Sequence, residues 1–258
     1  MSGFLEDVSK ERAKRLDEKL DWDRLFDIED KKDDFERSEE RGLDQDNLLT
    51  LNLTASIDDL DRFFRTQRQG LAMPIGLSGD MIFKTGDSYI IDAAKSYLQI
   101  FLIPPPLAAD EERSTESRKS ERRRFFRYHI EASPARGWLD PAKKIWIKGV
   151  KLLSDQSGFD VWQDLSTLYV EGFDQEPKAG LHPAPMLRGV LRLAPLDFFD
   201  KQLQTISITP IDADPARKSW GYGGFVHYFA DELASVYLER RGLIKAMAAN
   251  LLNPSRGG

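Results

Sequence analysis

The chain has 258 residues, 41% of them apolar and 31% charged, which suits one large globular domain or two small ones. It contains no cysteine, which excludes disulfides, thiolate metal sites and a cysteine nucleophile. A formal net charge of -6 argues against a nucleic-acid-binding protein, and three histidines leave little material for a multi-histidine metal site. We therefore expect no metal and no cofactor.

The sequence shows no membrane-spanning or secretory signal. No apolar run approaches the roughly 20 residues that span a bilayer. The longest, residues 100–107, is short and contains three consecutive prolines. Glu6 and Asp7 place charges where a secretory signal needs apolar residues. We expect a soluble cytoplasmic protein, and peripheral membrane contact through an amphipathic helix stays open.

Residues 1–45 are dense in charge, with 16 acidic and 10 basic residues up to Asp44. Apolar residues, among them Leu16 and Leu20, recur at steps of three or four between the charges. This spacing predicts a helical arm with a narrow apolar stripe. Because the stripe is too thin for a core of its own, the arm is expected to lie on the protein surface or to become ordered on a partner.

Residues 46–210 change character, because short runs rich in β-branched and aromatic residues alternate with turn signals. The candidate strands are 47–54, 72–83, 89–103, 124–131, 144–153, 167–171, 187–193 and 205–209. About eight strands at this spacing predict a mainly β domain, an antiparallel sandwich or barrel. A helix that begins with a cap at Ser56 and another near Pro195 are expected to interrupt it.

Residues 211–258 are expected to form a helical extension at the C-terminal end. A linker over 211–215 and a glycine-rich turn over 221–224 precede the predicted helix. Phe225, Phe229 and Leu233 follow helical spacing along it. Together with the two leucines of the N-terminal arm, these three residues are the candidate partner-binding residues.

One stretch resembles a known family. Residues 147–151 (Ile-Lys-Gly-Val-Lys) and 157–170 (Ser-Gly-Phe-Asp-Val-Trp-Gln-Asp-Leu-Ser-Thr-Leu-Tyr-Val) closely resemble the pattern G-F-K-V…D-P-G-F-D-L-W-x-D-T-T-T-L-Y-V. That pattern belongs to a β-rich domain of long bacterial proteins. There it follows a GMC-type, cholesterol-oxidase-like flavin domain and often precedes an α/β-hydrolase domain. Residues 189–205 and 51–63 resemble further parts of the same domain.

This chain lacks some sequence motifs of those long proteins, and these differences limit what the resemblance implies. The chain has neither a G-x-G-x-x-G motif after a first strand nor a G-x-S-x-G motif, so the flavin-binding and hydrolase halves are not expected here. Gln156 and Ser157 stand where the pattern often has Asp-Pro. The resemblance thus implies the middle module as a separate, non-catalytic accessory subunit, which docks on a GMC-like flavin oxidoreductase or an α/β-hydrolase.

The motif residues allow several roles. The motif candidates are Gly158, Phe159, Asp160, Trp162, Asp164 and Tyr169. Glycine and acidic side chains predict a structured turn before a strand, with the tryptophan covering one end of the β domain. The alternatives are the mouth of a ligand pocket, or a calcium site that uses the two aspartates.

Two other functions stay open. The many aromatic residues predict core packing, but a β-barrel can also hold an apolar pocket, which would make the protein a lipocalin-like lipid or sterol carrier. The second open function is that of an enzyme with an unrecognised site. The spacing of His129, His182 and His227 favours no serine–histidine–aspartate triad, so we expect no catalytic activity.

Overall fold

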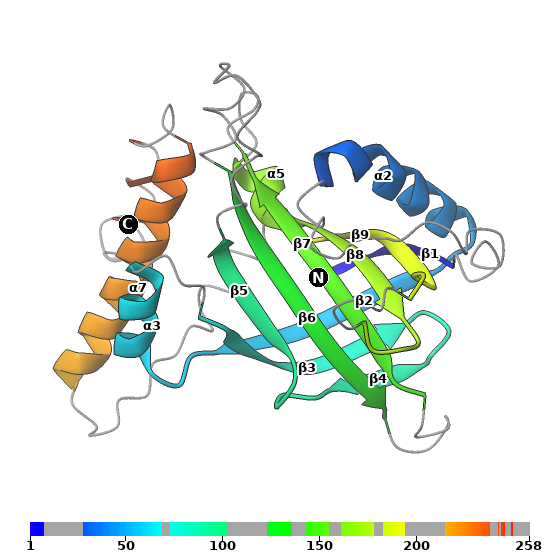
Figure 1. The fold of residues 1–258 in the computed structure, drawn as a ribbon, viewed down its shortest axis with the longest axis horizontal. Coiled ribbons are helices and arrows are strands. Elements are labelled where there is room, and N and C mark those ends of the chain that lie inside the picture. Colours follow the sequence, from blue (N-terminus) through cyan, green and yellow to red (C-terminus); the bar gives the residue numbers. More distant parts are fainter. Residues whose placement is uncertain are drawn as a thin grey trace, which may run out of the picture. The chain divides into compact units, whose positions relative to one another are not determined.

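The computed structural model describes residues 1–7, 28–68, 73–102, 123–135, 143–154, 161–177, 183–193 and 215–237, with 242, 244, 245 and 249. The elements in chain order are β1 (Ser2–Asp7), α2 (Ile28–Asp44), β2 (Leu48–Ser56), α3 (Leu60–Arg68), β3 (Ile75–Phe83), β4 (Ser88–Ile91), β5 (Tyr97–Leu102), β6 (Arg124–Pro134), β7 (Ile145–Leu153), α5 (Val161–Ser166), β8 (Thr167–Phe173), β9 (Leu187–Arg192) and α7 (Pro215–Val236) (Figure 1).

The chain divides into two compact units. The first comprises Met1–Leu102, Phe125–Leu152 and Leu165–Ala194, and the second comprises Ile103–Arg124, Leu153–Asp164 and Pro195–Gly258. The expected boundaries at residues 45 and 210 differ from this division. Strand β1 lies in the sheet of the first unit, so Ser2–Asp7 is part of the barrel.

The strands of the first unit form one mainly antiparallel sheet that closes on itself, and this confirms the predicted fold class. Neighbours follow the order β2-β1-β9-β8-β7-β6-β4-β3, and β2 also pairs with β3, which closes the ring. Strand β5 pairs with both β3 and β6, so β4 and then β5 occupy the position between them. The result is a β-barrel in which strands adjacent in sequence pair with each other in most cases, and β4 and β5 are an exception (Figure 1).

The pairing register separates an interior face from an outer face, because side chains alternate along a strand. Leu51 of β2 lies opposite Met81 of β3, and both are fully buried in the interior. The next residue of β3, Ile82, points outward and is 41% exposed. The interior residues Leu49, Leu51, Met81, Ile130, Ile147, Leu168 and Val170 have no accessible surface. Side chains therefore fill the middle of the barrel.

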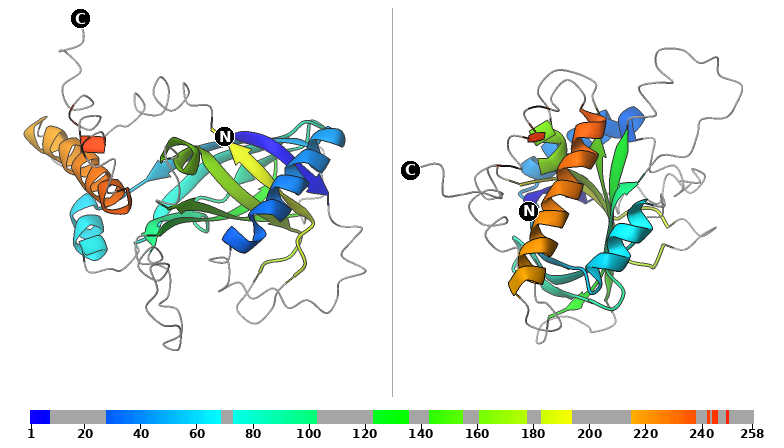
Figure 2. Two further views of the ribbon diagram at one scale, coloured as in Figure 1. Left: turned by 90° about the horizontal axis from the view of Figure 1, so that it is seen from above. Right: turned by 90° about the vertical axis from the view of Figure 1, so that its left-hand side faces the viewer.

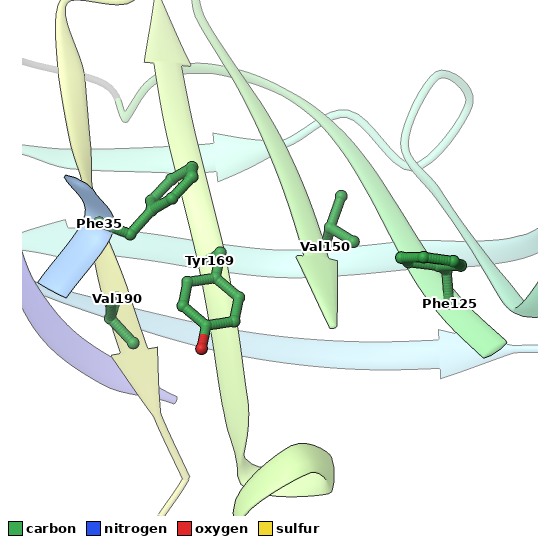
Figure 3. Close-up of a cluster of buried hydrophobic side chains, with 5 residues drawn as sticks. All are labelled: Phe35, Phe125, Val150, Tyr169 and Val190. Carbon is green, nitrogen blue, oxygen red and sulfur yellow. The ribbon is translucent and has the colours of Figure 1, made fainter. Parts of the chain in front are cut away.

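Helix α2 packs on the outer face of the barrel along β1 and β9 (Figure 2). Its Phe35 is 2% exposed and joins a buried cluster with residues of β6, β7, β8 and β9 (Figure 3). The cluster consists of Phe35, Phe125, Val150, Tyr169 and Val190. The predicted helical arm is therefore wrong for Ser2–Asp7, which forms a strand, and right for Ile28–Asp44, which lies on the barrel surface.

Most predicted strands are confirmed, with one split and one omission. The 89–103 run is two strands, because the Asp92 carboxylate accepts a hydrogen bond from the N–H of Ala94 and its carbonyl oxygen accepts one from Ser96, which makes a turn. The 205–209 strand lies outside the described residues, as does the helix expected near Pro195. Strand β1 was not predicted.

Two helix starts also differ from expectation. Helix α3 begins at Leu60, and its cap is Asp59, whose carboxylate accepts the N–H of Arg62 at 2.8 Å. Ser56, the expected cap, is the last residue of β2. Helix α7 begins at Pro215, so the glycine-rich segment 221–224 lies inside the helix and forms no turn. In the described part of the chain, no helix is long and apolar enough to cross a membrane.

Candidate functional site

The structure places only part of the motif that resembles the GMC-associated domain. Gly158, Phe159 and Asp160 lie outside the described residues, so the predicted turn and the calcium alternative at Asp160 stay predictions. Trp162 lies in α5, the short helix between β7 and β8, and only its backbone is described. Asp164 and Tyr169 are described with their side chains. Among the described residues, no group of three or more histidine, aspartate or glutamate side chains could hold a metal ion.

Asp164 acts as a structural hydrogen-bond acceptor within the second unit. Its Oδ2 accepts the backbone N–H of Ser154 at 3.1 Å and the Tyr237 hydroxyl at 2.5 Å. Ser154 follows the end of β7, and Tyr237 follows the end of α7. One carboxylate therefore joins two chain segments that lie far apart in sequence.

Tyr169 lies on the outer face of β8 and is 8% exposed. Its ring packs edge-on against Phe35 of α2, with 5.4 Å between the ring centroids and 65° between the ring planes (Figure 3). An interior ligand would lie on the opposite face of the strand. Tyr169 is therefore part of the contact that holds α2 on the outer face of the barrel.

A further motif position, Gly149 of β7, makes room inside the barrel. A Cβ atom there would lie 2.9 Å from Leu168 Cδ1 and 3.4 Å from Tyr128 Cβ. Leu168 is fully buried and Tyr128 is 5% exposed, so neither side chain has much space to move. Glycine thus lets β6, β7 and β8 pack closely, which gives this position a structural reason.

The interior of the barrel contains one charged side chain in its described part, Lys151 of β7. Its Nζ donates to the Leu165 carbonyl oxygen, at the end of α5, at 2.5 Å, and lies 5.9 Å from the centroid of the Tyr128 ring. Burial lowers the pKa of Lys151 to about 7. Burial also raises the pKa of the Tyr128 hydroxyl.

Sequence reasoning missed Lys151, although a signal exists. Ile145, Ile147, Gly149, Lys151 and Leu153 alternate along β7, and all of them are buried. A lysine in an apolar set of period two indicates a charge on the core face. The alternation is easy to overlook in the sequence, because the outward-facing residues of the same strand include a tryptophan and a valine.

Two carboxylates are buried on the outer face, each with basic partners. Glu131 of β6, 4% exposed, accepts hydrogen bonds from Lys95 at 3.0 Å and from Lys144 at 2.6 Å. Burial raises the pKa of Glu131, but the hydrogen bonds from the two lysines outweigh burial, so its pKa lies below its ordinary value. Glu171 of β8 accepts two hydrogen bonds from Arg188 of β9, at 3.0 and 2.8 Å.

The outer face of β3 and β4 carries exposed apolar side chains. Ile82 is 41% exposed and Ile90 is 57% exposed. The register places Asp80 opposite Ile90 and Ile82 opposite Ser88, so the two isoleucines are diagonal neighbours on one surface. We call Ile82 and Ile90 the isoleucine patch.

The histidines show no catalytic arrangement in the described part of the chain. His129 lies on the outer face of β6, with its ring stacked 5.1 Å from that of Tyr97, and burial lowers its pKa. His227 is exposed on α7, and His182 lies outside the described residues.

Comparison of the chain with protein-family models, with curated proteins and with solved structures finds no match.

Proposed function

We propose that this chain is a non-catalytic accessory module that docks, through the outer surface of its barrel, on a separately encoded protein. The proposed partner is a GMC-like flavin oxidoreductase, with an α/β-hydrolase as the alternative, in a cytoplasmic setting. The resemblance of residues 147–170 to the middle module of the long fused proteins motivates this partner.

The structural roles of the motif residues support a non-catalytic module. Gly149 allows close strand packing, Asp164 accepts two hydrogen bonds that join chain segments, and Tyr169 packs against α2. The described members of the motif therefore serve packing and hydrogen bonding within the fold. Such a motif is what an interaction module needs, because its function lies on the surface that the fold presents.

The isoleucine patch is the observation that carries the proposal. Of the large apolar side chains that the structure describes, only Leu43, Ile82 and Ile90 are exposed. Two of these three are neighbours, and they lie on adjacent strands of the barrel. Exposed apolar residues grouped on a firm scaffold are typical of a protein–protein contact.

The five candidate partner-binding residues occupy different environments in the structure. Leu16 and Leu20 lie outside the described residues. On α7, Leu233 is buried at 6% exposed, so it is not a surface contact as the chain is folded. Phe225 and Phe229 are half-buried, with their ring centroids 6.2 Å apart, and they remain candidates.

The experiment is affinity isolation of the tagged full chain from the cells that produce it, with identification of bound proteins. We compare the natural chain with Ile82→Ser/Ile90→Ser and with the matched control Leu43→Ser, which removes an exposed apolar side chain from α2. The proposal predicts that the natural chain and the control retain a flavoprotein or hydrolase, and that the double variant loses it. Retention of the partner by all three proteins would place the contact elsewhere and refute the role of the isoleucine patch.

A second candidate function, a carrier of an apolar ligand, is favoured by the closed barrel with a lysine inside it. The filled middle of the barrel weighs against a long lipid or a sterol, because residues such as Leu51 and Ile147 have no accessible surface. Organic extraction of the protein isolated from its cells, followed by mass spectrometry, distinguishes the two. A stoichiometric hydrophobic molecule would support the carrier.

A further inference from the structure

The surface around the isoleucine patch carries almost no charge. The register places outward-facing residues of β2, β3, β4 and β6 in two cross-strand rows. We call the seven residues of these rows the low-charge face: Thr50, Ile82 and Ser88 in one row, and Asn52, Asp80, Ile90 and Ser133 in the other. Asp80 is the one charged side chain among the seven, although 31% of the whole chain is charged. Depletion of charge is typical of the centre of a protein–protein contact.

The described lysines at the edge of the low-charge face already form ion pairs. Lys84, which follows β3, pairs with Asp46. Lys95 and Lys144 both pair with Glu131 of β6. Because carboxylates compensate these three lysines, they form no cationic edge suited to anionic lipid headgroups or to nucleic-acid phosphates. We therefore expect a protein surface to cover this face.

Asp80 lies at the centre of the low-charge face. It is opposite Ile90 in the register and two residues before Ile82 on the same side of β3. Its Oδ1 accepts a hydrogen bond from Asn52 Nδ2 at 2.8 Å, and no basic side chain among the described residues forms an ion pair with it. An ionised carboxylate has about four acceptor sites. A protein that covers the isoleucine patch must therefore also compensate this charge, since an unpaired carboxylate is costly away from water.

The position of Asp80 argues against a second copy of this chain as the occupant. In a two-fold symmetric contact, residues near the centre of the face meet the same residues of the other copy. The two Asp80 carboxylates would then approach each other, and like charges repel strongly where water is excluded. A different protein can place an opposite charge at that point.

We propose that the low-charge face docks a different protein, whose contact surface is apolar opposite the isoleucine patch and carries one lysine or arginine opposite Asp80. Ile82 and Ile90 supply apolar contact area, and Asp80 selects the partner. A wholly apolar surface leaves the carboxylate unpaired, and an acidic surface repels it, so both bind more weakly. This inference rests on the proposed docking function and adds the residue that discriminates between partners.

Retention of the partner by two Asp80 variants tests this inference. The tagged natural chain, Asp80→Asn, Asp80→Lys and the control Asp44→Asn are each added, over a series of concentrations, to extract of the producing cells after deletion of the gene for this chain. The flavoprotein or hydrolase that each one retains is then quantified.

The four proteins should differ in a defined order. Asp80→Asn keeps the shape of the side chain and an oxygen acceptor for Asn52 but removes the charge, so half-maximal retention should need at least about tenfold more of this variant. Asp80→Lys should retain no partner, because it places a cation against a cation. Asp44→Asn removes an exposed carboxylate from α2 and should match the natural chain.

Circular dichroism and urea unfolding of each variant check that the barrel is folded. Equal retention by the natural chain and Asp80→Asn, with loss of the partner by Ile82→Ser/Ile90→Ser, would overturn this inference and leave the docking function standing. A purified natural chain that sediments as a dimer, and that Ile82→Ser/Ile90→Ser converts to a monomer, would overturn the choice of occupant. A natural chain that retains neither a flavoprotein nor a hydrolase would refute the docking function, and this inference with it.

Discussion

Arg192, the last residue of β9, donates hydrogen bonds of 3.1 and 2.7 Å to the two carboxylate oxygens of Glu39 in α2, 153 residues earlier in the chain. The Arg192 side chain is 47% exposed, so this ion pair is expected to contribute only about 0–1 kcal/mol to stability. It orients the helix, while the burial of Phe35 supplies most of the free energy that holds α2 on the barrel. The N-terminal segment is therefore an integral part of the fold.

Replacing Phe35 by alanine should weaken this attachment strongly. The side chain is 2% exposed and contacts Tyr169, so its removal leaves a cavity and is expected to cost about 3–5 kcal/mol. Urea unfolding measures the loss, and hydrogen exchange should show faster exchange in α2 than in β7. Leu43→Ala on the same helix is the control, because Leu43 is 56% exposed and its loss should change stability little. Equal effects of the two variants would contradict this account of α2.

Alanine substitutions at Gly79 and Gly86 are expected to destabilise the fold for different reasons. Gly79 has a φ of 133°, and a Cβ atom there would lie 1.9 Å from the Asn52 carbonyl oxygen. Gly86 has a φ of 94° with open space around it. Gly86→Ala should therefore cost about 1–2 kcal/mol from backbone conformation alone, and Gly79→Ala distinctly more, because a backbone atom blocks the new methyl group. Chemical denaturation of both variants would refute the prediction if the order were reversed.

Glu131 should make the free energy of unfolding fall as the pH is lowered into the acidic range. Its folded-state pKa is lowered, so its contribution is present above the unfolded pKa of about 4.3 and is lost as pH falls through the folded value. At pH 7, Glu131→Gln should cost about 1–3 kcal/mol, because the hydrogen bonds with Lys95 and Lys144 lose one charge. Denaturation curves of the two proteins should converge toward low pH. Asp80→Asn, at a more exposed position, is the control, and a constant difference for Glu131→Gln at all pH values would contradict this assignment.

Lys151 should make stability rise with pH in the neutral to alkaline range. Its pKa is about 7 in the folded chain and about 10.4 when unfolded, so the folded state releases the proton first. The free energy of unfolding should therefore rise between pH 7 and about pH 10, by up to about 1.4 kcal/mol per pH unit. Lys151→Met should abolish this rise and should be more stable than the natural chain below pH 7. A natural chain whose stability is flat from pH 7 to 10 would show that the lysine stays charged.

The sequence was most informative where alternation and turn signals agree. Strands β2, β3, β6, β7, β8 and β9 follow from β-branched and aromatic runs between turn residues. Strand β1 does not, because its sequence Ser-Gly-Phe-Leu-Glu-Asp is short and charged, and pairing with β9 and β2 makes it a strand. Such long-range pairing leaves no local pattern in six residues.

The candidate site was less predictable for a similar reason. The role of Tyr169 depends on α2, whose docking position is set by tertiary packing. Predicting the exposure of the isoleucine patch requires knowing which face of β3 and β4 is covered, and the alternation of residues alone does not show this. The interior position of Lys151 is predictable, because its alternation with Ile147 and Gly149 is visible in the sequence.

Native mass spectrometry of the protein, isolated under mild conditions from the cells that produce it, tests the central claim most directly. The accessory-module account predicts a stoichiometric complex of this 29.5 kDa chain with a second protein, and flavin absorbance in that complex if the partner is the oxidoreductase. The isoleucine-patch variant should then release the free chain. A natural chain that appears only at its own mass, or with only a small molecule bound, would contradict the account.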